Sequence, residues 1–312
     1  MASLREIKDR IGSVRSTLKI TSAMKLVASA KLRKAQRAIE ALRPYERTLA
    51  DIFAAVAAVR PDVPASRLPS SLSAGAETGF DGANPAAAEA SPTGNIGAAN
   101  TAATAVVAIA SNSSLCGGFN ANVVRKTLET IRGCEGAVEV YPLGRKMTEA
   151  LRRAGYTADQ DYNDLVGHPS YEQSAALARR LAERYERGEI ARVVLVYTSF
   201  VSASRQEPVA ETYLPFSASF AGLTGESPEE EYLLEPDAAA LAAQLLPQVM
   251  LLKFHAAILD SAAAEQAART LAMQTATDNA EDLLGELTLE YNKGRQQKIT
   301  AEILDLLGGS QQ

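Results

Sequence analysis

The fold of this chain is decided by residues 4–56, which read LREIKDRIGSVRSTLKITSAMKLVASAKLRKAQRAIEALRPYERTLADIFAAV. Apolar residues recur here at alternating spacings of three and four, the spacing of a two-stranded coiled coil. The stripe comprises Leu4, Ile7, Ile11, Val14, Leu18, Thr21, Lys25, Ala28, Leu32, Ala35, Ile39, Leu42, Glu46, Leu49, Phe53 and Val56. Only Thr21, Lys25 and Glu46 are polar. A register kept this long predicts a helical rod, because an ordinary globular helix averages about three turns.

The C-terminal part of the chain has the same character. No proline follows Gln248, and an apolar stripe with phase slips passes through Leu252, Ala256, Leu259, Ala263, Ala280, Leu284, Leu287, Tyr291, Ile299, Ile303 and Leu306. One helix of roughly 60 residues is therefore expected, about 90 Å long at 1.5 Å per residue. Because neither helix would be stable alone, we expect the two to pair as a long antiparallel coiled coil within one chain. Pro44 should kink or briefly break the first helix near Arg43.

Short apolar runs alternate with helical patterns between these two helices. We expect strands at residues 104–110, 137–141, 192–197 and, at a sheet edge, 208–216, with helices ending near 132 and spanning 145–154 and 171–187. This alternation predicts a central Rossmann-like α/β domain with a mostly parallel sheet.

The low-complexity segment before the first strand is too poor in large apolar residues to fold alone, so we expect it to be a disordered insertion. The predicted organisation is therefore an N-terminal helix at 1–60, the insertion at 61–103, the α/β domain at 104–236 and a C-terminal helix at 237–312.

Composition and charge limit the class of function. The chain has 312 residues, a net charge of −5 and no stretch of 18 apolar residues, and its charged N-terminus has no signal-peptide core. We therefore expect a cytosolic protein or one peripheral to a membrane. Residues 1–43 carry eleven Lys or Arg against three acidic residues, a charge that suits nucleic acid or acidic protein loops. Residues 1–44 hold no aromatic residue and no DNA-binding motif, which argues against nucleic acid.

Residues able to support catalysis are scarce. The two cysteines, Cys116 and Cys134, have neither a C-x-x-C spacing nor a zinc-site setting, and the two histidines, His168 and His255, lack a supporting motif. Cys116-Gly117-Gly118 follows a predicted strand but matches neither a dinucleotide-binding fingerprint nor a P-loop. We interpret these three residues as a structural turn, and we expect no catalytic residue, cofactor or metal.

Two other classes of function stay open on this reasoning. The chain could be an α/β enzyme that dimerises through its helical arms, for which ligand binding by the isolated chain would be the test. It could also be a basic coiled-coil adaptor for nucleic acid, for which steeply salt-dependent DNA binding would be the test.

Several longer motifs carry a family resemblance. They are IGSVRSTLKITSAMKLV at 11–27, LCGGFN at 115–120, YLLEPD at 232–237, AMQTATDNA at 272–280 and YNKGRQQKITAEI at 291–303. In kind and in order they resemble the signatures of the gamma subunit of rotary ATP synthases, covering both ends and the middle of the chain.

The resemblance implies a central rotor shaft without bond chemistry of its own. One copy would stand inside a ring of alternating alpha and beta subunits. The α/β domain would contact the epsilon subunit and the c-subunit ring at the cytoplasmic face of a bacterial inner membrane. Proton flow would then turn the shaft and drive ATP synthesis at the beta subunits, or hydrolysis would turn it in reverse. The shaft positions that touch the ring would be Met24, Lys25, Arg269, Gln296 and Thr300.

The sequence departs from the family at one motif and one connection. Where the family has Ser-Asp-Arg-Gly or a similar run, this chain has Ser111-Asn112-Ser113-Ser114, so a local ion pair is expected to be missing there. The segment at 61–103 is longer than the usual connection and lacks the two cysteines of the redox-regulated insertion of chloroplast relatives. We expect no thiol switch.

Overall fold

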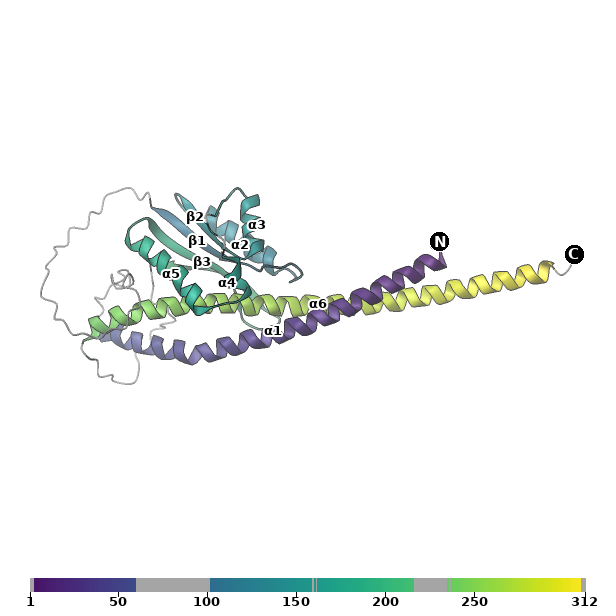
Figure 1. Ribbon diagram of the computed structural model, residues 1–312, viewed down its shortest axis with the longest axis horizontal. Coiled ribbons are helices and arrows are strands. Elements are labelled where there is room, and N and C mark those ends of the chain that lie inside the picture. Colours follow the sequence, from purple (N-terminus) through teal and green to yellow (C-terminus); the bar gives the residue numbers. More distant parts are fainter. Residues whose placement is uncertain are drawn as a thin grey trace.

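The computed structural model describes residues 3–59, 102–158, 160, 162–215, 235 and 237–309. Two long helices, α1 (Leu4–Val59) and α6 (Ala238–Gly309), lie side by side in opposite directions and form a rod. An α/β domain sits against the end of the rod where α6 begins (Figure 1), and both chain termini lie toward the other end. The expected insertion at 61–103 lies outside the described residues except for its last two.

The apolar stripe of residues 4–49 is the surface through which α1 meets α6. Every one of its members from Leu4 to Leu49 is buried or half-buried; the side chains of Phe53 and Val56 lie outside the described residues. The helix also continues through Pro44, so the expected break near Arg43 is wrong, whereas the alternative of a kink there stays a prediction. A proline removes one backbone hydrogen bond, and here Leu42 and Leu49, which flank Pro44, pack against the core of the α/β domain and hold the helix in place.

The second helix extends beyond its partner at its C-terminal end (Figure 1). It begins at Ala238, where the Asp237 carboxylate accepts a hydrogen bond from the Ala240 amide (2.8 Å), and it contains Pro247. At the far end, the α1 residue Leu4 lies against Gly294 of α6.

Beyond Gly294, α6 continues as an overhang without a partner (Figure 1). Ile299 and Ile303 are 47% and 51% exposed there, so the expected seam stops near Tyr291. The side chain of Leu306 lies outside the described residues.

The α/β domain contains a four-stranded sheet in the order β2-β1-β3-β4. The strands β1 (Ala103–Ile109), β2 (Val138–Leu143) and β3 (Ile190–Phe200) are parallel, and β4 (Gln206–Leu214) pairs antiparallel at the edge. The prediction of a mostly parallel sheet with an edge strand is thus confirmed, and the antiparallel direction of that strand is a finding of the structure. The helices are α2 (Phe119–Arg132), α3 (Arg145–Arg153), α5 (Tyr171–Glu186) and a short α4 (Asn163–Gly167) that the sequence pattern did not indicate.

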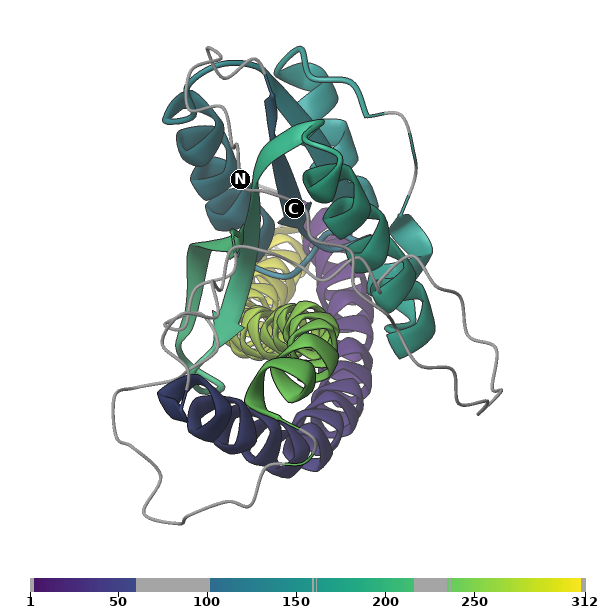
Figure 2. The same cartoon turned by 90° about the vertical axis from the view of Figure 1, so that its left-hand side faces the viewer.

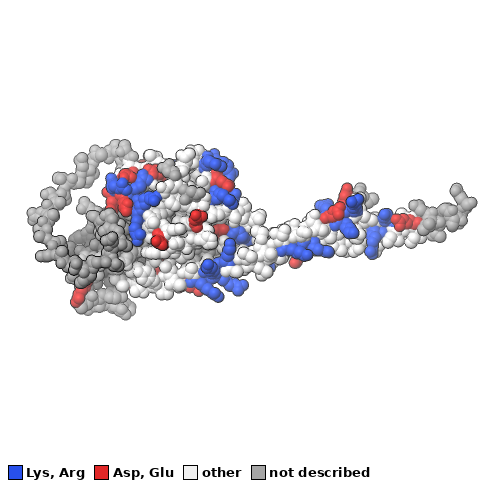
Figure 3. All heavy atoms as spheres, viewed as in Figure 1, with Lys and Arg blue, Asp and Glu red and all other residues white. Residues whose placement is uncertain are grey.

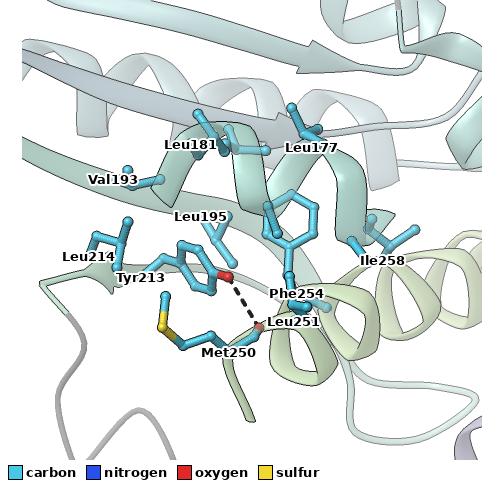
Figure 4. Close-up of a cluster of buried hydrophobic side chains, with 14 of the residues drawn as sticks. Leu177, Leu181, Val193, Leu195, Tyr213, Leu214, Met250, Leu251, Phe254 and Ile258 are labelled. Atoms are coloured by element: carbon cyan, nitrogen blue, oxygen red, sulfur yellow. Dashed lines mark hydrogen bonds between the residues drawn. The ribbon is translucent and has the colours of Figure 1, made fainter. Parts of the chain in front are cut away.

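Side chains alternate between the two faces of the sheet. Val106 and Ala108 of β1 pack with α2 and α3, whereas Ala105 and Val107 point to the opposite core. This second core is built by α5 and by the first half of α6, and Figure 4 shows Phe254 and Ile258 of α6 among its residues. The Tyr213 hydroxyl of β4 donates a hydrogen bond to the Met250 carbonyl of α6 (3.1 Å).

One helix therefore serves two structures. α6 forms half of the rod and also covers one face of the sheet, and the end view in Figure 2 shows the rod running along that face. Because the same buried side chains belong to both parts, the rod and the α/β domain form one packed unit.

Candidate interface on the helical rod

The three polar members of the α1 stripe each meet a polar partner on α6. Lys25 Nζ donates a hydrogen bond to Gln274 Oε1 (2.8 Å), and Thr277 Oγ1 donates to Thr21 Oγ1 (3.0 Å). Nearer the α/β domain, Lys253 forms an ion pair with Glu46. Lys25, one of the five candidate ring contacts, is thus engaged across the rod.

Arg269, a second candidate, is buried rather than presented to solvent. Its guanidinium pairs with Glu265 one turn earlier on α6 (2.7 Å), and both side chains are 10% exposed. It also donates a hydrogen bond to Ser113 Oγ in the β1–α2 loop (2.7 Å). The arrangement ties this loop to the rod.

Residues 111–114, where the sequence departs from the family, carry no charged side chain. Asn112 Oδ1 accepts a hydrogen bond from the Arg145 amide (2.9 Å), and the Asn112 carbonyl accepts one from the Arg145 guanidinium (2.9 Å). Asn112 Nδ2 donates to the Asn163 carbonyl (2.8 Å). Hydrogen bonds therefore hold the loop.

Of the other three candidates, one lies beside Lys25 and two lie on the overhang. Met24 is half-buried on α1, next to Lys25. Gln296 and Thr300 are exposed on the α6 overhang, where the Thr300 hydroxyl bonds only the Gln296 carbonyl of its own helix (2.9 Å). The five positions thus fall into two groups along the rod, Met24, Lys25 and Arg269 in its middle and Gln296 and Thr300 on the overhang, and their role as ring contacts stays a prediction.

The structure adds apolar candidates that our sequence reasoning missed. Ile20, Leu26 and Val27 of α1 are largely exposed, Leu26 by 69%, and Leu289 of α6 is more exposed still. All four lie off the stripe that pairs the helices. The sequence could have identified them, because a large apolar residue outside the seam of a two-helix rod has no surface of the same chain to cover it. Ile20 and Val27 are seven residues apart and so lie on one side of α1, which makes them candidates for contact with another protein.

The polar surface of α1 is strongly basic. Its exposed basic side chains are Arg5, Lys8, Arg10, Arg15, Lys19, Lys31, Arg33, Lys34, Arg37, Arg43 and Arg47. Figure 3 shows basic groups spaced along the rod. A partner that surrounds α1 would therefore meet apolar and positively charged groups together, which suits acidic loops with apolar contacts beside them.

The turn at Cys116-Gly117-Gly118 joins β1 to α2. Gly117 has a φ of 57°, in the left-handed region that favours glycine, and a Cβ there would lie 3.6 Å from the Ala272 Cβ of α6. The buried Cys116 sulfur accepts a hydrogen bond from Asn120 Nδ2 (3.1 Å). The turn lies beside a cavity of about 440 Å³ between α2, β4 and α6.

A second, smaller cavity lies between α1, α6 and the sheet, around Glu46, Lys253 and Asp260. Burial raises the pKa of the Asp260 carboxyl, although Ser199 Oγ donates a hydrogen bond to it (3.3 Å). Burial and the nearby Glu211 likewise raise the pKa of the Tyr197 hydroxyl. These groups form a network that connects the rod to the sheet.

The described residues contain no cluster of three or more His, Cys, Asp and Glu arranged to bind a metal. Both cysteines are free thiols. In the part of the chain with assigned structure, none of the helices combines the length and hydropathy needed to cross a membrane.

Comparison with known proteins identifies the family. The family model described as ATP synthase matches residues 3–311. A protein named ATP synthase gamma chain from Bacteroides fragilis is 44% identical over 99% of both chains. The protein of the same name from Bacteroides thetaiotaomicron is 43% identical over the full length of both. A third, from Pelotomaculum thermopropionicum, is 35% identical over 99% of both.

Solved structures support the same fold. The chain resembles one in the rotor of the Euglena gracilis mitochondrial ATP synthase, with a TM-score of 0.57 and 17% identity over 95% of this chain and 98% of that one. A chain in the OSCP/F1/c-ring structure from the same organism gives a TM-score of 0.59 at 17% identity, covering 99% and 93%. From the family match along almost its whole length and the identity of its bacterial relatives, this chain belongs to the ATP synthase gamma chain family.

Proposed function

We propose that this chain is the central rotor shaft of an ATP synthase. It couples transmembrane proton flow to ATP synthesis or hydrolysis by rotating inside a ring of alpha and beta subunits, and it carries out no bond chemistry itself. The observation that carries the proposal is the long antiparallel rod that shares α6 with the core of the α/β domain. Torque applied to the domain would pass into the rod without crossing a flexible linker.

The surface of the rod suits this role. The ring would contact the exposed Ile20, Leu26 and Val27 and the basic groups of α1. Of the positions carried over from the family, Met24, Gln296 and Thr300 would contact the ring directly; Met24 is half-buried and the other two are exposed. Lys25 and Arg269 would act through Gln274 and Glu265, the partners they hold within the chain.

The remaining partners follow from the same assignment. The α/β domain would face the epsilon subunit and the c-subunit ring, so that one copy of the chain per complex contacts the membrane only through that ring. We place the complex at the cytoplasmic face of a bacterial inner membrane. Functionally, the chain divides into shaft helices at 1–60 and 237–312, an insertion at 61–103 and the α/β domain at 104–236.

The test is assembly with the alpha and beta subunits of the same source. Co-expression should give a complex whose native mass corresponds to three alpha, three beta and one copy of this chain. ATPase turnover should depend on the chain, and deleting residues 296–312, most of the overhang, should reduce turnover at least severalfold.

Other outcomes would point elsewhere. A chain that stays apart from the ring, or joins it in several copies, would overturn the shaft assignment. Steeply salt-dependent DNA binding, or binding of a small molecule by the isolated chain, would instead support the adaptor or the enzyme alternative.

A further inference from the structure

We propose that the polar residues in the seam of the rod are positioning residues that fix the axial register of α1 against α6. The inference rests on the shaft function proposed above. It concerns Thr21, Lys25, Gln274 and Thr277, which we call the distal clasp, together with the proximal Glu46–Lys253 pair.

All of these contacts belong to a single alignment of the two helices. From Thr21 to Glu46 the seam advances 25 residues along α1, while the partner moves back 24 residues along α6, from Thr277 to Lys253. The contact between Leu4 and Gly294 continues this alignment to the end of α1.

The distal clasp lies inside the buried seam. Thr21 and Thr277 are 8% and 5% exposed. The Thr277 hydroxyl lies 3.0 Å from Thr21 Oγ1 and 2.8 Å from the Met273 carbonyl of its own helix, and Thr21 Oγ1 donates to the Leu18 carbonyl (3.1 Å). Gln274 accepts from Lys25 and donates from Nε2 to Asp278 (2.6 Å). Every buried polar group of the clasp is satisfied in this register.

One part of the apolar seam would define register weakly. Between the clasp and the Glu46–Lys253 pair the seam contains alanines such as Ala28, Ala263 and Ala267, and small, similar side chains pack almost as well after a shift along the helix axis. A polar residue at a seam position of a coiled coil selects one register at some cost in stability, because other registers leave it unpaired.

The sequence makes the alternative registers unfavourable. A slip of one heptad moves α6 by about 10 Å. In one direction Lys25 would meet Glu281, but Glu46 would meet Asp260, a second carboxylate, and Thr21 would meet Leu284. In the other direction Thr21 would meet Thr270, but Glu46 would meet Leu246 and Lys25 would meet Ala267. Of these three alignments, only the observed one gives all three polar positions of α1 a suitable polar partner on α6.

The polar seam contacts matter more at one end of the rod than at the other. Near Glu46, α1 is also held by Leu42 and Leu49, which pack on the core of the α/β domain. Thr21 lies 25 residues away, roughly 37 Å along the helix at 1.5 Å per residue. There the polar pairs of the clasp are the register-specific contacts, so the clasp would keep the far part of the rod from sliding under load.

The test compares register and coupling in the assembled complex. The clasp variant combines Thr21→Val and Thr277→Val, which keep side-chain bulk and remove the hydroxyl contact between the two helices. Thr288→Val is the matched control, because Thr288 is exposed and bonds only the Leu284 carbonyl of its own helix. The rescue variant carries Thr21→Ser and Thr277→Ser, which keep both hydroxyls.

Register is read by disulfide formation in a Cys116→Ser, Cys134→Ser background. Leu4→Cys with Gly294→Cys reports the observed register, and Leu4→Cys with Leu287→Cys or Ala301→Cys reports a slip of one heptad. We expect the clasp variant to lose at least half of the first crosslink and to gain one of the other two. The control and the rescue variant should keep the original pattern.

Coupling is read as ATP-driven proton pumping per ATP hydrolysed. The clasp variant should lose at least twofold in this ratio, with ATPase turnover within twofold of the unmodified complex and an unchanged or higher melting temperature. A purely structural role would lower the melting temperature without producing slipped crosslinks. That result, or an unchanged crosslink pattern and pumping ratio, would overturn the proposal.

The two proposals fail in different ways. If the unmodified chain does not enter the ring, the shaft function fails, and the crosslinks can still be measured on the full chain alone. If the clasp variant does not assemble, the single substitution Thr277→Val is measured by the same crosslinks and pumping ratio, and the same results support or overturn the proposal.

Discussion

At the scale of single residues, the buried ion pair of α6 is the sharpest feature. Glu265 and Arg269 are almost fully enclosed, and the Ser113 hydroxyl accepts a further hydrogen bond from the guanidinium. Removing one member of a buried pair leaves an uncompensated charge, whereas replacing both by apolar residues is often nearly neutral. We therefore expect Arg269 to act mainly by stabilising the contact between the β1–α2 loop and the rod.

A double-mutant cycle tests this assignment. Glu265→Leu should lower the free energy of unfolding by about 3 kcal/mol, and Glu265→Leu with Arg269→Leu should recover most of that loss. Urea unfolding of the full chain is the measurement. The exposed pair Arg125–Glu129 is the control, because Arg125→Ala should change stability by less than about 1 kcal/mol. Equal losses in the single and double variants would contradict the buried-pair interpretation.

At the scale of elements, the contact between α5 and α6 contains a buried histidine. His255 Nδ1 lies 2.8 Å from Ser174 Oγ, and Tyr171 stacks edge-on against the ring. Burial lowers the pKa of the His255 imidazole below its usual 6.5. The folded chain therefore binds fewer protons at this site than the unfolded chain when the pH lies between the lowered pKa and 6.5.

This difference predicts a pH dependence of stability. The contribution of His255 is fully present above pH 6.5 and is lost as the pH falls below it, by up to about 1.4 kcal/mol for each unit of pKa lowering. Melting temperatures measured from pH 8 to pH 5 should show this decline. His255→Gln should flatten it, whereas substitution of the exposed His168, the only other histidine, should not. If the melting temperature of His255→Gln still declined with falling pH to the same degree, the pH dependence would come from other groups.

At the scale of the whole molecule, the stability of α6 should change along its length. Its first half is enclosed by the sheet, α5 and α1, its middle is paired with α1, and its last turns stand alone. A helix without tertiary packing is marginally stable in water, so local opening needs little free energy there.

Hydrogen exchange on the free chain tests this gradient. Backbone amides of residues 250–268 should exchange only through global unfolding, and those of 295–304 should exchange orders of magnitude faster. Assembly with the ring should slow exchange in the overhang if that segment is enclosed as proposed. Uniform protection along α6 in the free chain would contradict the structure-based assignment of the overhang.

Much of the architecture could be predicted from the sequence, because periodicity is a local property. The stripe from Leu4 to Leu49 identified the buried face of α1, and the apolar runs located β1, β2 and β3. The helix break at Pro44 was predicted wrongly because packing of Leu42 and Leu49 outweighs a local penalty. The prediction extended the seam too far beyond Tyr291, because the apolar pattern of one helix does not show where its partner helix ends.

The sequence by itself determined the class of structure: a two-helix rod with an α/β domain between its halves, and the family to which the chain belongs. Tertiary structure alone decided which residues are available to a partner. Arg269 and Lys25 are polar residues on helices in the sequence, yet the fold engages both within the chain, while Leu26 and Val27 are left exposed. The physical reason is that helix periodicity follows from residues a few positions apart. The pairing partner of a side chain depends on the register between segments about 250 residues apart, as for Lys25 and Gln274.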